Sequence, residues 1–271
     1  MSRLIFLLVV AVGVCPLAST ARSGRAQPLR SANKVARAPA ADTPRSLLPE
    51  GLYFGMSGGR AGDRAWLLRL NTSTGEGNLY MPPERLKLRF TQSPDGKVHI
   101  ESAEGFGDLT YTFDGQAEGA SLTGRFRFAR KGQRDGDDAN TFPVTLRRVD
   151  DKLQDKNYAT SVSGLYSNVE YNEEGSDLTG AELVLLRDQG RLLGILTLHE
   201  EEMLPYAVTG VVVSKQQLQF KTRTQSGDEA YRAILSRDKI RLRRTDAAAS
   251  HETTSMVLSK KKTLREFLNE K

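Results

Sequence analysis

VHIESAEGFGDLTY (residues 98–111) and LQFKTRTQSGDEAY (residues 218–231) are two stretches of this chain that align without a gap. Five positions of the alignment stand out, because the paired residues are identical or similar. They are Val98 with Leu218, Ile100 with Phe220, Gly107 with Gly227, Asp108 with Asp228, and Tyr111 with Tyr231. Each stretch is typical of a strand, a Gly-Asp turn and a second strand. We therefore expect the apolar residues of the two stretches to face the same side of their sheets.

The similarity extends beyond these stretches and predicts a tandem duplication. Gly51-Leu52-Tyr53 opens the first unit and Gly164-Leu165-Tyr166 opens the second, while strand-like segments at 144–148 and 256–260 close them. A chain of 271 residues can hold two ordinary domains, each with its own core. The predicted fold class is all-β, with two tandem small antiparallel β-barrel or barrel-like domains at residues 49–150 and 163–271, joined by a linker at 151–162.

The first 21 residues are typical of a secretory signal peptide. Arg3 precedes an apolar run at residues 4–14, and the small residues Ser19, Thr20 and Ala21 suit cleavage before Arg22. The run is too short for a spanning helix, which needs about 20 residues. We therefore expect an exported protein, periplasmic or secreted. A lipoprotein anchor at Cys15 is the less favoured alternative, because residues 12–14 lack the expected small residue before the cysteine.

Residues 22–48 are expected to form a disordered basic linker, because they are rich in Ala, Pro, Ser and Arg and lack an apolar period. Six cations and Asp42 give this linker a net charge of +5. When that charge and Arg3 are removed from the total of +6, residues 49–271 are neutral. The linker could make weak contact with an anionic surface, or it could be a solvated spacer.

Alternating apolar and polar residues predict the strands of the first domain. The segments are 66–70, 86–90, 98–101, 111–113 and 125–128. Asp95-Gly96, Asp114-Gly115 and Glu118-Gly119 are expected to form tight turns, since Gly tolerates a positive φ. This number of short strands favours a barrel or a sandwich.

The second domain repeats this plan and ends in a short C-terminal helix. The predicted strands are 181–187, 192–199, 206–213, 217–222, 230–236 and 239–243, with a hairpin turn at Arg237-Asp238. Thr263 and Glu266 form a capping box, and Leu264, Phe267 and Leu268 share one face of the helix that follows. We expect this helix to dock on the second domain.

Aromatic residues concentrate in the first domain, at positions 66, 80, 90, 106, 111, 113, 126, 128 and 142. They indicate either a filled small core or a site for a planar ligand. An eight-stranded barrel is only just wide enough for its own side chains, which favours the filled core.

No catalytic constellation emerges, so we expect a protein that is not an enzyme. Gly55-Met56-Ser57-Gly58-Gly59 has the spacing of a nucleophile elbow, but a strand rather than a helix follows, which favours a flexible hairpin loop. A hydrolase using Ser57 is therefore a remote alternative. Ser31 and Lys34 have the spacing of a β-lactamase motif, but they lie in the linker.

Metal and cofactor sites are not expected either. The three histidines, His99, His199 and His251, are far apart in the sequence, and alternation places the first two at the surface or at strand ends. Two acidic groups could in principle bind calcium, but their spacing matches no calcium loop: Glu200, Glu201 and Glu202; Glu173, Glu174 and Asp177. Asn71-Thr72-Ser73 is a glycosylation sequon.

The segments 113–115, 120–128 and 142–148 resemble the closing strands of small secreted bacterial β-barrel domains, loosely called lipocalin-like and many of unknown function. The second domain departs from this pattern, since it has no Phe-Pro start to its closing strand. The resemblance implies a fold and leaves the ligand open.

Export and an all-β architecture without catalytic groups favour a binding or interaction protein of the cell envelope or exterior. Its partner would be a small apolar ligand or an envelope protein, held at a barrel mouth or by loops such as 55–63 and 170–177, with no nucleic acid. The alternative is an envelope structural protein whose basic arm lies on an anionic polymer.

Overall fold

The computed structural model describes residues 47–59, 62–82, 84–104, 109–130, 141–150, 162–172, 177–199, 204–236, 238–245 and 255–269. The expected signal peptide and most of both expected linkers lie outside these ranges, as do Gly107, Asp108 and Arg237.

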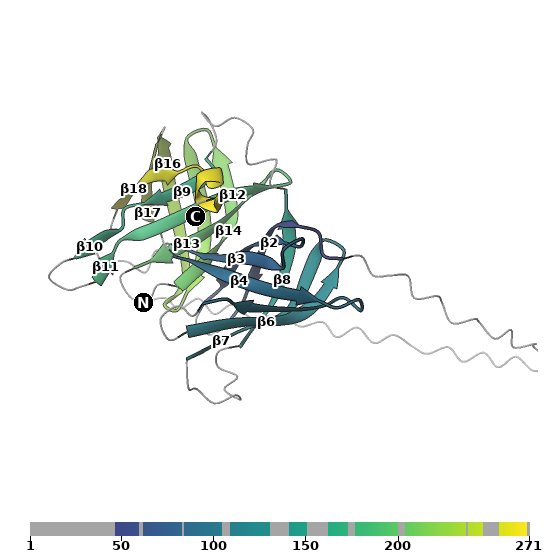
Figure 1. Cartoon of the computed structure of the whole chain (residues 1–271). Helices are drawn as coiled ribbons and strands as arrows, with labels where there is room; N and C mark the ends of the chain where they lie inside the picture. Colours follow the sequence, from purple (N-terminus) through teal and green to yellow (C-terminus); the bar gives the residue numbers. More distant parts are fainter. Residues whose placement is uncertain are drawn as a thin grey trace, which may run out of the picture. The chain divides into compact units, whose positions relative to one another are not determined.

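An eight-stranded antiparallel barrel forms from the first half of the chain (Figure 1). Its strands pair in chain order, and the first strand closes the ladder by pairing with both the second and the last. The strands are β1 (Gly51–Ser57), β2 (Arg64–Asn71), β3 (Glu76–Met81), β4 (Glu84–Gln92), β5 (Lys97–Ser102), β6 (Leu109–Glu118), β7 (Ser121–Arg130) and β8 (Thr141–Val149).

Aromatic and aliphatic side chains fill the interior of this barrel, as predicted. Trp66 stacks on Phe126 with ring centroids 4.2 Å apart, and Phe113 lies 5.0 Å from Phe126. Leu48 also belongs to this core, and its backbone N–H donates to Gln92 Oε1 at 2.9 Å. Leu48, the last residue of the expected linker, therefore packs into the barrel, because burial removes its apolar side chain from water. Phe54 and Tyr80 are also buried, but they belong to a second cluster outside the barrel interior.

A second set of strands packs outside the barrel. It consists of β9 (Gly164–Ser167), β12 (Ala181–Asp188), β13 (Arg191–Leu198), β14 (Leu204–Ser214), β15 (Gln217–Thr224), β16 (Gly227–Ser236), β17 (Lys239–Arg244) and β18 (Ser255–Lys262). Their pairing order is β14-β13-β12-β9-β18-β17-β16-β15, and β14 also pairs with β15. A separate hairpin, β10 (Glu170–Asn172) with β11 (Asp177–Thr179), follows β9. On one side of the eight strands, apolar residues such as Leu183, Leu196, Phe220 and Leu242 form a core cluster.

The two sets of strands meet along β2 and β14. Their ladders are joined at a single residue pair, Arg64 with Tyr206, where the guanidinium carbon also lies 4.9 Å from the centre of the Tyr206 ring. Beside this pair, a mixed apolar cluster combines residues of the barrel, such as Leu67 and Tyr80, with residues of the second set, such as Val184 and Leu186.

The C-terminal helix α1 (Leu264–Asn269) begins at the predicted capping box. Thr263 N donates to Glu266 Oε2 at 2.8 Å, and Glu266 N donates to Thr263 Oγ1 at 3.2 Å. Leu264, Phe267 and Leu268 are buried in the mixed cluster. The helix therefore packs on β9, β12 and β18 of the second set, as expected. Its last turn also contacts Tyr80 of the first barrel.

Two of the predicted Gly turns are wrong because the glycines lie within strands. Gly115 is inside β6 and pairs with Gly124 of β7. A Cβ at either position would lie within 2.6 Å of the Phe113 ring, so the two glycines make room for that ring. In the second repeated stretch the turn is formed by Gln225 and Ser226, and Gly227 and Asp228 already belong to β16.

The repeated stretches place their apolar residues alike but pair them differently. Val98 and Ile100 are buried on their strand, as are Leu218 and Phe220 on theirs. Phe220 pairs with Tyr231, whereas Ile100 pairs with Phe113 instead of Tyr111. The pairing register thus differs from the gap-free alignment by two residues, which keeps every side chain on its expected face.

Candidate functional site

Ser57 is not in a flexible loop, because it is the last residue of β1 and is buried. Its Oγ accepts a hydrogen bond from Trp66 Nε1 at 2.8 Å. A buried hydroxyl that accepts a hydrogen bond from the side chain of a packed tryptophan is poorly placed to attack a substrate. The loop interpretation is corrected for this residue, and its geometry gives the hydrolase alternative no support.

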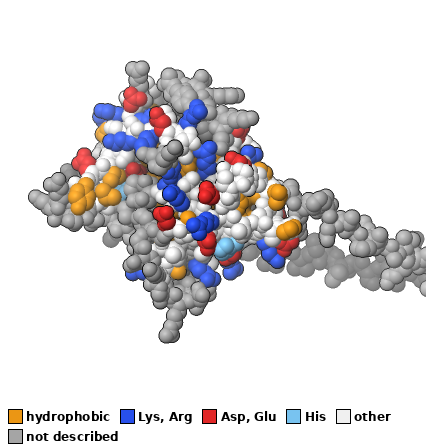
Figure 2. All heavy atoms as spheres, in the orientation of Figure 1, with side chains coloured by type: hydrophobic (Ala, Val, Ile, Leu, Met, Phe, Trp, Pro, Cys, Tyr) orange, Lys and Arg blue, Asp and Glu red, His pale blue; other side chains and the backbone are white. Residues whose placement is uncertain are grey.

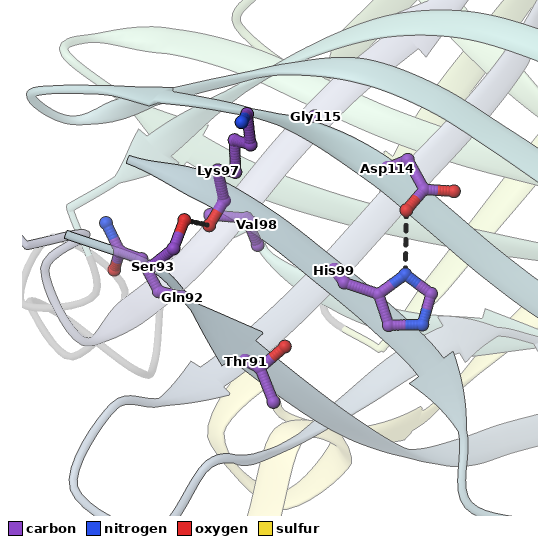
Figure 3. A pocket seen from close by; sticks show the side chains of 8 residues that line it. All are labelled: Thr91, Gln92, Ser93, Lys97, Val98, His99, Asp114 and Gly115. Carbon is purple, nitrogen blue, oxygen red and sulfur yellow. Dashed lines mark hydrogen bonds and ion pairs between the residues drawn. The ribbon is translucent and has the colours of Figure 1, made fainter. Parts of the chain in front are cut away.

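His99 lies at the surface, as predicted, and lines a shallow hollow of about 420 Å³ (Figure 3). Its Nδ1 lies 2.7 Å from Asp114 Oδ1, and both side chains are exposed. Thr91, His99 and Asp114 occupy opposite positions on the neighbouring strands β4, β5 and β6. The imidazole is oriented by a carboxylate, but the solvent around the pair weakens their interaction.

His199 follows the end of β13, as predicted, but its side chain is fully buried. The ring Nε2 lies 3.5 Å from Glu182 Oε2, and Thr197 is buried beside this pair. Of the two expected positions, surface or strand end, the structure shows the strand end. The side chain is buried because the outer side of β12 and β13 is covered in the fold. Neither ring nitrogen hydrogen-bonds to a described residue.

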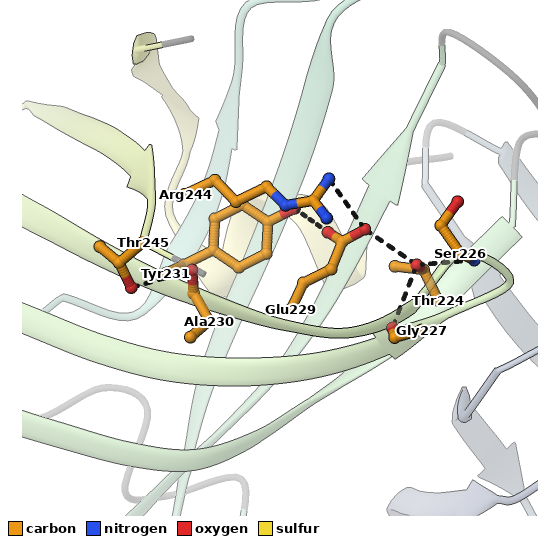
Figure 4. Close-up of polar contacts among 8 residues, drawn as sticks. All are labelled: Thr224, Ser226, Gly227, Glu229, Ala230, Tyr231, Arg244 and Thr245. Carbon is orange, nitrogen blue, oxygen red and sulfur yellow. Dashed lines mark hydrogen bonds and ion pairs between the residues drawn. The ribbon is translucent and has the colours of Figure 1, made fainter. Parts of the chain in front are cut away.

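Glu229 is a buried carboxylate that was not predicted as a site residue (Figure 4). Thr224 Oγ1 donates to Oε1 at 2.9 Å, the Tyr231 hydroxyl donates to Oε2, and Arg244 Nη1 lies 3.2 Å from Oε1. Thr222 is buried on the same side of β15. Both carboxylate oxygens already have partners within the protein. The network is therefore suited to stabilising the fold where these buried polar groups adjoin the apolar core of the second set.

A wider groove of about 610 Å³ crosses β2, β3 and β4 next to the end of α1. Arg69, Arg85 and Lys87 line it together with Glu50, Glu76 and Glu104, so its charges are mixed. Arg69 is tied to the helix, because its Nη1 donates to Asn269 Oδ1 at 2.5 Å. The end of α1 therefore forms one wall of the groove, and strands of the first barrel form the rest.

The outward side of β15, β16 and β17 is strongly basic. We call this surface the basic face. It is defined by the exposed cations Lys221, Arg223, Arg232, Lys239, Arg241 and Arg243. Asp228 is the one outward-pointing acid on these three strands, and Asp238 lies in the turn between β16 and β17. Figure 2 shows Lys and Arg side chains over the part of the molecule where Figure 1 labels β16 to β18, with some acidic side chains among them.

The register of the basic face brings like charges together. Arg232 lies directly opposite Arg243, and Arg241 occupies the next outward position on β17. Like charges at opposite positions destabilise a sheet. On β5 to β7 of the first barrel, by contrast, the outward cations Lys97, Arg125 and Arg127 are mixed with Glu101 and Asp114.

Several predicted candidates lie outside the described residues: Cys15, Ser31, Lys34, Phe106, Glu173, Glu174, Glu200, Glu201, Glu202 and His251. Asp177 begins β11. The sequon residue Asn71 ends β2, and its Oδ1 accepts a bond from Ser73 N at 3.1 Å. The described residues contain no group of three metal-ligating side chains.

A helix long and apolar enough to span a membrane is also absent from the described ranges. No protein-family model matches the sequence, and no curated protein matches it.

Proposed function

We propose that this chain is an exported, non-enzymatic binding protein, built from two tandem eight-stranded β-barrels, that holds an anionic partner on its outer surface. The observation that supports this proposal is the basic face, where cations predominate. The groove beside α1 and the outer side of β5 to β7 carry cations and acids together. The packed aromatic core of the first barrel argues against a ligand held inside it. Export rests on the signal peptide expected at residues 1–21.

The tandem arrangement is supported by the strand order. The second set runs β9-β18-β17-β16-β15-β14-β13-β12, which repeats the order β1-β8-β7-β6-β5-β4-β3-β2 position by position. In this comparison β9 corresponds to β1, β14 corresponds to β4 and β15 corresponds to β5. The pairing of β14 with β15 is then equivalent to the pairing of β4 with β5.

Details at the opening strands also support a duplication. Gly51 and Gly164 have φ of 149° and 147°. Two residues later, the hydroxyls of Tyr53 and Tyr166 donate to backbone carbonyls four residues before them, those of Pro49 and Val162. These shared features are independent of the repeated stretch that suggested the duplication.

The first experiment measures retention of the exported chain on immobilised dextran sulfate as salt is raised. Arg232→Glu combined with Arg241→Glu should elute at clearly lower salt than the wild type, because these changes reverse two charges of the basic face. Arg125→Glu combined with Arg147→Glu is the matched control, since both residues are exposed on the first barrel.

A third variant tests the alternative of an envelope structural protein with a basic arm. It replaces Arg25, Arg30 and Arg37 of the linker with Gln. If this variant loses retention and the basic-face variant keeps it, the arm is the contact and the proposed function is wrong.

A further inference from the structure

We infer that the partner of the basic face is an anionic lipid membrane, which the protein contacts with cations and exposed aliphatic side chains together. This inference rests on the proposed function and specifies its partner. It starts from three aliphatic residues that the fold leaves in water: Val212 at 59%, Ile234 at 52% and Val257 at 42% exposure.

Strand register places these three residues among the arginines. One row across the sheet is Val212, Gln219, Arg232, Arg243 and Ser255, on β14 to β18 in order. The next row is Ser214, Gln217, Ile234, Arg241 and Val257. Neighbouring strands lie about 4.8 Å apart, so each aliphatic side chain lies within two strands of a guanidinium-bearing residue.

The tip of the β14–β15 hairpin extends this pattern. Val213 is also exposed, and Lys215, with φ of 53°, forms the turn that follows. An apolar tip beside a cation matches the chemistry of a membrane interface, where acyl chains lie below phosphate groups. The long arms of Lys and Arg let the charge remain at the phosphates while the neighbouring aliphatic groups go deeper.

The aliphatic residues distinguish a membrane from other polyanions. A soluble anionic polymer would neutralise the arginines but leave Val212, Ile234 and Val257 hydrated. A single-stranded nucleic acid would use aromatic side chains for base stacking, and the outward positions of β15 to β17 carry none. A membrane removes apolar surface from water and supplies negative charge at the same time.

The test is co-sedimentation of the exported chain with phosphatidylcholine vesicles, with and without phosphatidylglycerol. We expect binding only when phosphatidylglycerol is present. Arg232→Glu with Arg241→Glu should weaken binding about tenfold or more, since each cation near an anionic membrane contributes measurably. Val212→Ser with Ile234→Ser should also weaken it, while Met56→Ser, an exposed apolar residue of the first barrel, should not.

A second readout reports insertion directly. Cys15 is the only cysteine and lies in the expected signal peptide, so Ile234→Cys can carry an environment-sensitive fluorophore. Its emission should shift to the blue on anionic vesicles and stay unchanged on dextran sulfate.

The outcomes separate this inference from the proposed function. If dextran sulfate binds through the arginines but vesicles show no blue shift and no effect of Val212→Ser with Ile234→Ser, the membrane inference is wrong and the proposed function stands. Preference for an oligonucleotide over anionic vesicles would also overturn the membrane inference. If the wild-type chain binds neither dextran sulfate, nor anionic vesicles, nor an oligonucleotide, both the proposed function and the membrane inference are wrong.

Discussion

At the scale of single residues, two buried tyrosines illustrate how the fold controls ionisation. Burial raises the pKa of Tyr53 to about 12, with Arg148 opposing the shift, and burial together with Asp238 raises the pKa of Tyr166 to about 12. Each hydroxyl donates to a backbone carbonyl, a bond that only the neutral phenol can make.

These tyrosines predict a loss of stability in alkali. An unfolded tyrosine ionises near pH 10, whereas Tyr53 and Tyr166 stay neutral in the fold up to about pH 12. The free energy of unfolding should therefore be unaffected by these groups below about pH 10 and should fall as the pH rises toward 12. Urea unfolding at a series of alkaline pH values measures this loss.

Phenylalanine variants supply the control for this prediction. Tyr53→Phe with Tyr166→Phe should reduce the alkaline loss, although Tyr80 and Tyr111, whose pKa values burial also raises, will keep part of it. Tyr171→Phe, at an exposed tyrosine, should leave the alkaline loss unchanged. A loss identical in the double variant and the wild type would contradict the prediction.

The alternation of apolar and polar residues predicted individual strands well, because it depends only on which face of the strand is exposed to solvent. Outward Arg241 and Arg243 alternate with buried Ile240 and Leu242, as expected from the sequence. Gly115 was misinterpreted because its role depends on the Phe113 ring. The burial of His199 was not predicted because the residues that cover it come from the tertiary fold. The basic face was detectable in the alternation of β15 to β17, but a net charge of zero over residues 49–271 concealed it.

At the scale of elements, the C-terminal helix depends on its first turn. Thr263 and Glu266 satisfy each other's backbone amides. The bonds that Thr263 N and then Thr263 Oγ1 donate to the carboxylate hold the pKa of Glu266 below its usual value, with Lys260 and Lys262 adding to the shift. Six residues are too few for a helix to persist without such a cap and a buried face.

Thr263→Ala should lower the free energy of unfolding by about 0.5–2 kcal/mol, the usual cost of losing an N-cap. Because the Glu266 pKa is depressed, its contribution should be present above the unfolded pKa and be lost as the pH falls through the folded value. Urea unfolding of the variant and the wild type at neutral and acidic pH checks both statements. Thr110→Ala, an exposed strand residue, serves as control. A difference between Thr263→Ala and the wild type that persists unchanged at low pH would refute the role of the Glu266 carboxylate.

At the scale of the whole molecule, the mixed cluster under α1 couples the two sets of strands. Tyr80 Oη donates to the carbonyl of Leu268 at 2.7 Å, and the Tyr80 and Phe267 rings lie 5.3 Å apart. Val184 and Leu186 of the second set are fully buried in the same cluster. The described chain should therefore unfold in one transition.

Phe267→Ala should uncouple that transition. Removal of a buried phenyl ring costs about 3–5 kcal/mol. Here it also removes the ring of α1 that packs against Tyr80 in the mixed cluster. Trp66 is the only tryptophan and lies in the first barrel, so its fluorescence reports on that barrel, while circular dichroism reports on all strands. The two signals should coincide in the wild type and separate in the variant. Signals that remain coincident after the substitution would show that the coupling lies elsewhere.

The bond between Tyr80 and Leu268 joins residues 188 positions apart, which bears on how the protein is made. Among the described strands, every ladder partner within the first barrel precedes residue 150, and the only later ladder partner is Tyr206 of β14, which pairs with Arg64. The barrel can therefore close before the rest of the chain has been made. The outer apolar surface that includes Leu67 and Tyr80 is covered only by later segments, first the second set of strands and finally α1. A nascent chain that is stalled or truncated before Leu264 would expose the part of this apolar surface that α1 covers, although the barrel is already closed. Exposed apolar surfaces of this kind bind chaperones and promote aggregation.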